Sequence, residues 1–131
     1  MKILAVDDSF ECIKFHRKLF NYLFADTDFE LDFEMSARAG YNKVLGSADE
    51  PYNLIISDLE MENMEDEVYA GIWFVRNILQ REECRDSRII IVSGSYDIDR
   101  IAEGLGVYYI PKNELFKNPL LMKYKLEEIF N

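Results

Sequence analysis

The chain has 131 residues, of which 49% are hydrophobic, and it carries a net charge of −10 from 25 acidic and 15 basic residues. This length and composition predict one domain with a hydrophobic core, and the acidic balance excludes a basic nucleic-acid-binding face. The two cysteines, without a CxxC or histidine pattern, indicate reduced thiols rather than a disulfide framework or a zinc site. No apolar run approaches the roughly 20 residues of a membrane span, so we expect no membrane segment and a cytoplasmic protein.

The first half of the chain alternates between strand and helix patterns. Residues 2–6 are a continuous apolar run, which favours a strand buried on both faces. Over 9–24, apolar residues recur at helical spacing in two stripes, which form either a wide buried face or a partner surface. Residues 29–35 alternate apolar and acidic side chains, as in a half-exposed edge strand, and 37–48 predict a short helix.

The second half continues the same alternation. A buried strand at 54–57 precedes an acidic loop that runs to about Val68. The remaining patterns predict a helix at 69–83, a strand at 89–92, a short helix at 97–104, a strand at 107–110 and a last helix that opens at Asn118-Pro119 and ends at Phe130. Strands that alternate with helices in this way favour an α/β fold, a doubly wound parallel sheet with helices on both faces.

Acidic residues end two of the predicted strands. Asp7 and Asp8 follow the first strand, and Asp58 follows the third. The carboxyl ends of parallel strands meet at one rim of the sheet, where ligands bind, so we expect these side chains to share a pocket. Three close carboxylates repel one another unless a cation lies among them, and oxygen ligands suit Mg²⁺ or Mn²⁺.

Two further polar residues belong to the same rim. Ser93 ends the fourth strand and Lys112 closely follows the fifth, so the set gains a hydroxyl and an ammonium. This set suits phosphoryl transfer to a carboxylate, because Mg²⁺ and lysine neutralise charge on the transferring oxygens and the hydroxyl donates to one of them. Aspartate can be the covalent acceptor, and Asp58, alone at its strand end, is the predicted one. Asp7 and Asp8 are then predicted to hold the metal.

With these residues in this order, the chain resembles the receiver domain of two-component response regulators. The resemblance extends over residues 1–131, as a single receiver domain with no output domain, and implies the flavodoxin-like strand order 2-1-3-4-5. It implies that Asp58 receives a phosphoryl group from a sensor histidine kinase or phosphotransfer protein, and that the switched surface then binds a downstream protein target or a second copy in a homodimer. Such a protein assists its own phosphorylation but is not a turnover enzyme.

The resemblance also implies roles for individual residues. Mg²⁺ would be held by Asp8, Asp58 and the main-chain carbonyl of Glu60, with Asp7 helping through water. Two switch residues would reorient on phosphorylation. These are Ser93 and Tyr109, the latter three residues before Lys112 and directly after Tyr108.

The chain departs from the family pattern in three places. Glu62 stands near the usual proline position, and Gly71 follows Asp58 by thirteen residues rather than about eight, so the loop between them has grown. The order Pro111-Lys112-Asn113 replaces the family's Lys-Pro pair, and because a cis bond is costly outside X-Pro we expect a trans Lys112–Asn113 bond. The stretch 93–112 is shorter than in the family, so we expect a shorter helix within it. That helix belongs to the face that the family uses for dimer formation or output, and this face is the property that the resemblance supports least.

Other candidate residues favour packing or solvation. His16, Trp73, Cys12 and Cys84 are predicted to pack in the interior. The acidic loop is either a solvated segment or one that attracts Mg²⁺ or repels an anionic phosphodonor, and its acids are Glu60, Glu62, Glu65, Asp66 and Glu67. Its start imitates a calcium loop, but Asn63 and Tyr69 stand where an EF-hand needs glycine and glutamate.

The sequence leaves one alternative function open and opposes two others. The long loop and the missing Lys-Pro pair also suit a phosphorylation-independent interaction module on a receiver scaffold. A flavin-binding protein is disfavoured, because Asp7-Asp8 would repel a phosphate where such sites use Ser, Thr and Gly amides. A haloacid-type phosphatase needs paired acids two residues apart, whereas Asp7 and Asp8 are adjacent.

Overall fold

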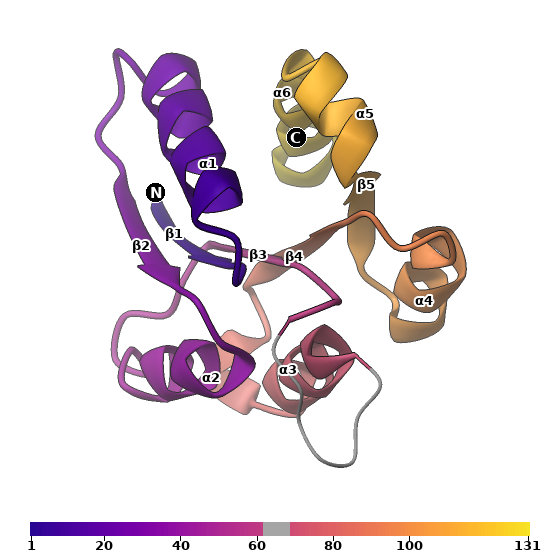
Figure 1. Cartoon of the computed structure of the whole chain (residues 1–131). Coiled ribbons are helices and arrows are strands. Elements are labelled where there is room, and N and C mark those ends of the chain that lie inside the picture. The colour runs from indigo at the N-terminus through magenta and orange to yellow at the C-terminus, as the bar shows by residue number, and fades with distance from the viewer. Residues whose placement is uncertain (62–68) are drawn as a thin grey trace.

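The computed structural model of the chain describes residues 1–61 and 69–131, and within these residues five parallel strands form one sheet in the order β2-β1-β3-β4-β5 (Figure 1). The strands are β1 (Lys2–Val6), β2 (Glu30–Glu34), β3 (Leu54–Ser57), β4 (Arg88–Ser93) and β5 (Tyr108–Pro111). This order confirms the predicted α/β, flavodoxin-like fold. It also places β2 at one edge of the sheet, where its alternating side chains are only partly buried.

Helices cover both faces of the sheet. They are α1 (Phe10–Leu23), α2 (Ala37–Leu45), α3 (Ala70–Leu79), α4 (Ile98–Leu105), α5 (Lys112–Lys117) and α6 (Leu120–Phe130), with a 3₁₀ turn, η1 (Glu82–Cys84), after α3. The helices α1, α5 and α6 lie on one face, and α2, α3 and α4 lie on the other (Figure 1), and the two sets contribute to separate hydrophobic cores. Within the described residues, none of these helices has the length and apolar character needed to cross a bilayer.

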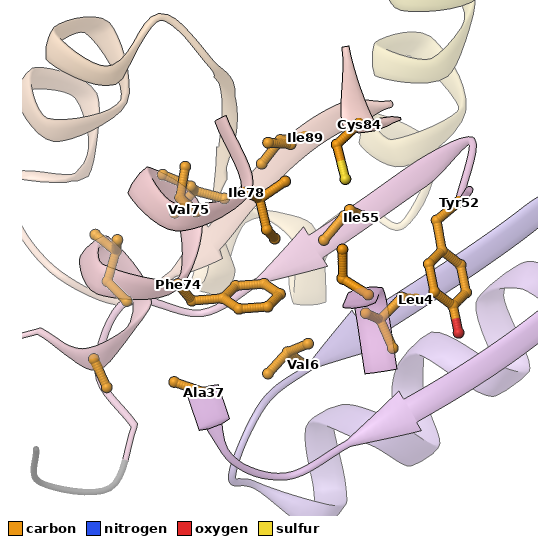
Figure 2. Close-up of a cluster of buried hydrophobic side chains, with 14 of the residues drawn as sticks. Leu4, Val6, Ala37, Tyr52, Ile55, Phe74, Val75, Ile78, Cys84 and Ile89 are labelled. Atoms are coloured by element: carbon orange, nitrogen blue, oxygen red, sulfur yellow. The ribbon is translucent and has the colours of Figure 1, made fainter. Parts of the chain in front are cut away.

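The central strands supply side chains to two cores at once. In β4, Ile89 and Ile91 face the helices α2 to α4, whereas Ile90 and Val92 face α1 and α6. Figure 2 shows the first of these cores, in which the ring of Phe74 on α3 points toward β1 and β3. Full burial of a side chain of this size stabilises the fold by about 2–3 kcal/mol relative to its exposure. A strand that is buried on both faces is a continuous apolar run, which is why the sequence pattern locates these strands well.

Local hydrogen bonds define where several helices begin and end. The hydroxyl of Ser9 accepts the N–H of Cys12 at 3.3 Å and begins α1, and the hydroxyl of Ser36 accepts the N–H of Ala39 at 3.0 Å and begins α2. Each such cap contributes about 1 kcal/mol. At the other end of α4, Gly106 adopts the left-handed conformation (φ 73°), which glycine adopts without steric cost.

The second half of the chain differs from the sequence prediction in three elements. The helix predicted over 69–83 ends at Leu79, whose side chain is 49% exposed rather than inward. Residues 112–117 form α5, a helix that the sequence analysis did not predict, because six residues are too few to display a helical period. At the start of the last helix, Pro119 has helical dihedral angles and the carbonyl of Asn118 accepts the N–H of Leu121 at 3.0 Å, which agrees with the predicted order of cap and first helical residue. The regular helix begins one residue later, at Leu120, and no side-chain hydrogen bond caps it.

Two aromatic side chains keep contact with solvent, and of these Trp73 is less buried than predicted. Phe10, the first residue of α1, is 57% exposed, so the second apolar stripe of this helix is not buried along its whole length. Trp73 is half-buried beside the core between α2 and α3. There the guanidinium of Arg38 lies 4.6 Å from the centroid of its ring, and Tyr41 packs edge-on against it.

The single histidine and both cysteines are interior packing residues, as predicted. Cys12 and Cys84 are buried free thiols. His16 is buried on α1 between the rings of Phe15 and Phe20, and its Nδ1 has no hydrogen-bond partner among the described residues. Burial, assisted by the charge of Lys112, lowers the pKa of His16 to about 4, so the imidazole is neutral at physiological pH.

The buried imidazole links folding stability to pH. The unfolded chain protonates His16 at about pH 6.5, whereas the folded protein does so at about pH 4. Between these values the unfolded state binds more protons, so stability falls as the pH falls. We expect this residue alone to remove about 3 kcal/mol of unfolding free energy between pH 6.5 and pH 4.

Urea titrations of wild type and His16→Phe at several pH values would isolate this effect. The carboxylates titrate in both proteins, so their contribution cancels in the difference between the two unfolding free energies. A difference that stays constant from pH 6.5 to pH 4 would contradict the prediction.

Candidate functional site

The polar residues predicted from the sequence lie together at the carboxyl ends of β1, β3, β4 and β5. They are Asp7 and Asp8 directly after β1, Asp58 directly after β3, Ser93 at the end of β4 and Lys112 directly after β5. The backbone N–H of Asp58 donates to the carbonyl of Val6 at 3.1 Å, which continues the pairing of β1 with β3 one residue beyond the strands. Parallel pairing therefore places the acids of these two strands side by side.

Three carboxylates and one ammonium form the centre of this group. Asp7, Asp8 and Asp58 each offer a carboxylate oxygen, and these three oxygens lie within 4.8 Å of one another. Nζ of Lys112 lies 3.0 Å from Oδ2 of Asp7 and 2.9 Å from Oδ2 of Asp58, and it donates to both. Asp7 and Asp58 are buried whereas Asp8 is exposed, so the cluster opens to solvent on the side of Asp8.

Backbone N–H groups orient both buried carboxylates. The N–H of Ser9 donates to Oδ1 of Asp7 at 2.8 Å. The N–H groups of Leu59 and Glu60 donate to Oδ1 of Asp58 at 2.7 and 3.3 Å. One oxygen of each carboxylate is therefore held by the main chain while the other faces the ammonium, which fixes the cluster before any ligand arrives.

Burial and neighbouring charges act in opposite directions on these groups. Burial disfavours the charged form of Lys112, but the carboxylates of Asp58 and Asp7 outweigh it and raise the pKa of the ammonium above its ordinary value. Burial raises the pKa of the Asp7 carboxyl, against the opposing effects of the Ser9 N–H and the Lys112 charge. One ammonium balances only one of the two carboxylates that it contacts, so the buried set keeps an excess of negative charge.

A second set of contacts connects Ser93 to Glu60. The hydroxyl oxygens of Ser93 and Ser95 lie 3.1 Å apart, and the N–H of Ser95 donates to Oγ of Ser93 at 3.2 Å. The hydroxyl of Ser95 donates to Oε1 of Glu60 at 2.9 Å. The sequence predicts that the side chains of Glu60 and Ser95 lie beside the site, but it does not predict the bonds that connect them to each other and to Ser93. The spacing Ser93-Gly94-Ser95 is the signal that could have indicated two neighbouring hydroxyls.

Tyr109 lies on β5 beside this set. It pairs in register with Ile91 of β4 and packs against the core beneath α4, whereas Tyr108 is 36% exposed. Tyr109 and Ser93 both line a cavity of about 400 Å³. The two predicted switch residues, Tyr109 and Ser93, are therefore neighbours at one cavity.

The comparisons with known proteins identify this architecture. No protein-family model and no curated protein matches the sequence. A response regulator receiver domain protein (CheY-like) from Methanospirillum hungatei JF-1 is 19% identical, and its structure matches over 98% of this chain and 94% of its own with a TM-score of 0.64. The BeF3-activated DrrB receiver domain is 18% identical (98% and 96% covered, TM-score 0.71), and the Mn(2+)-bound form of response regulator Rcp1 is 22% identical (98% and 93%, TM-score 0.69).

The chain has the fold of a response-regulator receiver domain. The coverage is nearly complete on both sides, so the resemblance is to the receiver domain as a whole rather than to one motif. The Lys112–Asn113 bond of this receiver fold is trans, as predicted, because every peptide bond among the described residues is trans. Lys112 occupies the first position of α5, directly after Pro111, and reaches both buried carboxylates from there.

Gly71, at the start of α3, lies against the end of β3. The N–H of Gly71 donates to the carbonyl of Leu59 at 3.0 Å. A Cβ at this position would lie 2.0 Å from the carbonyl oxygen of Asp58, so only glycine permits the contact. Of the acids between these points, Glu60 is described, whereas Glu62, Glu65, Asp66 and Glu67 lie outside the described residues, and the predictions about them remain predictions.

Gly71→Ala is expected to destabilise the protein because its methyl group would collide with the carbonyl of Asp58. We expect a loss of about 2–3 kcal/mol of unfolding free energy, at the upper end of overpacking effects. Gly104→Ala is the matched control, because it lies in α4 with open space around its Cβ position. That substitution should stabilise the protein by about 0.5–1 kcal/mol. Equal effects of the two substitutions in urea denaturation would contradict the proposed contact.

Lys112→Met is expected to destabilise the protein, because it removes the ammonium from between Asp7 and Asp58 while keeping most of the side-chain volume. We expect a loss of about 2–3 kcal/mol at pH 7 without divalent cations, below the full cost of breaking a buried pair since Lys112 retains some solvent contact. Lys123→Met on the exposed surface of α6 is the control. Unfolding free energies that agree for the two variants would show that the ammonium is not needed to hold the carboxylates.

Proposed function

We propose that this protein is a phosphoacceptor response regulator. In this proposal Asp58 receives a phosphoryl group from a sensor histidine kinase or a phosphotransfer protein, and the modified protein then presents an altered surface to a downstream protein. The observation that supports it most directly is the contact of the Lys112 ammonium with the carboxylate of Asp58, at a rim that also holds Asp7 and Asp8. A receiver fold that served only as a scaffold would not need a buried ammonium shared between two acids.

The chemistry follows from the position of these groups. A carboxylate oxygen of Asp58 attacks the phosphorus of a phosphohistidine donor. The new P–O bond forms as the P–N bond breaks, and the electron pair of that bond remains on the imidazole. Negative charge is spread over the transferring oxygens, and Lys112 beside Asp58 stabilises it. Ser93 stands at the end of the neighbouring strand and supplies a hydroxyl donor to one of those oxygens.

The donor set fits a divalent cation. Asp7, Asp8 and Asp58 offer hard oxygen ligands that converge, and the buried pair keeps more negative charge than Lys112 balances. We assign Asp8, Asp58 and the main-chain carbonyl of Glu60 as the residues that would hold Mg²⁺ or Mn²⁺, with Asp7 helping through water. A bound cation would supply further neutralisation of charge on the transferring oxygens. The similar Rcp1 structure is of a Mn(2+)-bound form.

In this proposal, phosphorylation of Asp58 changes the protein surface through Ser93 and Tyr109. In this proposal Ser93 moves toward the phosphoryl group and Tyr109 turns within the cavity that the two residues share. The protein is modified rather than turning over an external substrate. Two buried free thiols, Cys12 and Cys84, suit a reducing compartment, so we place this activity in the cytoplasm.

Phosphorylation of Asp58 is directly testable by intact-protein mass spectrometry. Incubation with Mg²⁺ and a small phosphodonor should add one phosphoryl group to the wild type. Asp58→Asn should gain none, because an amide is not a nucleophile for this transfer. Chelation of the divalent cation should abolish the gain in the wild type, since the charge on the transferring oxygens is then no longer neutralised.

Asp49→Asn is the matched control for the same experiment. Asp49 is an exposed acid in the loop before the amino end of β3, whereas Asp58 follows its carboxyl end, so this variant should gain the phosphoryl group like the wild type. A wild type without any mass gain, or an Asp58→Asn variant that still gains mass, would contradict the proposed function.

A further inference from the structure

The contacts from Ser93 to Glu60 have a defined hydrogen-bond direction. A serine hydroxyl has one proton, and an ionised carboxylate can only accept. Since Ser95 donates its proton to Glu60 at 2.9 Å, the bond between Ser95 and Ser93 must use the proton of Ser93. The N–H of Ser95 meanwhile donates to Oγ of Ser93, so this oxygen accepts one bond and gives one. The single proton of Ser93 is therefore committed to Ser95.

We propose that Ser95 and Glu60 are positioning residues that hold the proton of Ser93 away from Asp58 in the unmodified protein. This inference rests on the proposed function, in which Ser93 donates to an oxygen of the phosphoryl group on Asp58. The donation requires the proton that Ser95 now accepts. Phosphorylation must therefore break the bond between Ser93 and Ser95, and the strength of that bond opposes the modified state.

Burial makes this competition effective. Ser93 is 1% exposed and Ser95 is 7% exposed, so only a small part of either side chain faces solvent. At an exposed site, a serine that changes partners exchanges one bond for another with water at small cost. Between two buried hydroxyls the partners are limited to those present, and a bond lost on one side is regained only at the phosphoryl group.

Glu60 connects the two sets of contacts around Asp58. Its main-chain N–H donates to Oδ1 of Asp58 at 3.3 Å, and its side chain accepts the proton of Ser95. A shift of the Asp58 carboxylate that moves the backbone of Glu60 thus acts on the group that sets the direction of the Ser93 bond. Glu60 therefore contacts Asp58 through its main chain and, through its side chain, holds Ser95, the hydrogen-bond partner of Ser93.

Binding of beryllofluoride with Mg²⁺, measured by isothermal titration calorimetry, tests this inference without phosphoryl turnover. Beryllofluoride serves as the phosphoryl mimic on Asp58. Ser95→Ala removes the acceptor of the Ser93 proton, so we expect it to bind beryllofluoride about three- to tenfold more tightly than the wild type, the factor that one net hydrogen bond corresponds to. Ser95→Thr keeps the hydroxyl and should bind within about twofold of the wild type.

A double-mutant cycle separates this role from a merely structural one. In a Ser93→Ala background, Ser95→Ala should no longer change the affinity for beryllofluoride, because residue 93 then has no hydroxyl proton that the loss of Ser95 could release. Ser95→Ala should also lower the melting temperature by about 3–5 °C, because the resting protein loses internal hydrogen bonds. A structural residue would weaken stability and binding together, whereas here the two are expected to change in opposite directions.

The outcomes of the beryllofluoride experiment separate the proposed function of the protein from the role of Ser95 and Glu60. A wild type that binds no beryllofluoride would overturn the proposed function, and this inference with it. A wild type that binds, together with a Ser95→Ala variant that binds equally or more weakly, would overturn only the role of Ser95 and Glu60. A gain in affinity on Ser95→Ala that persists in the Ser93→Ala background would also overturn only the role of Ser95 and Glu60.

Discussion

One ammonium shared between two buried carboxylates determines the arrangement of the rim. Lys112 is the first residue of α5, and in the sheet order β5 is separated from β1 by β4 and β3. Its ammonium nevertheless meets the carboxylates of the acids that follow β1 and β3 and bonds to both. Without a cation, Asp7 and Asp58 would repel each other in a medium that screens charge poorly. Chain segments that are far apart in sequence are thereby held at one place by a single charged group.

Two kinds of interaction meet around Asp58. On the side of β1 the contacts are ionic, between carboxylates and an ammonium. On the side of β4 they are hydrogen bonds between hydroxyls that end at a carboxylate, that of Glu60. The ionic contacts are strong and hold the carboxylate of Asp58 in place, whereas single hydroxyl bonds are weak enough to be exchanged. The rim therefore combines a rigid half with an adjustable half, and the segment 58–60 belongs to both.

The strands and the residues at their ends could be predicted from the sequence because two physical rules restrict them strongly. Strands buried on both faces must be apolar throughout, and parallel strands bring their carboxyl ends to one rim, so Asp58 and Lys112 had to converge. The remaining features depend on neighbours that a single sequence does not show. The exposure of Leu79 depends on where α3 ends against the sheet, and α5 is too short for a period. The bond from Ser95 to Glu60 depends on the rotamers of two side chains.

The close approach of Gly71 to Asp58 has a consequence for how this protein tolerates change. The hydrogen bond from Gly71 to Leu59 ties the start of α3 to the end of β3, on either side of the segment between them. Closing a loop of twice the length costs only about 0.6 kcal/mol more. We therefore expect the chain to accept foreign sequence after Met61, whose side chain packs against the core, such as a peptide tag or a small reporter domain, while the geometry around Asp58 is preserved. A receiver fold anchored in this way could carry an inserted reporter domain close to Asp58, where the reporter would respond to changes at that site.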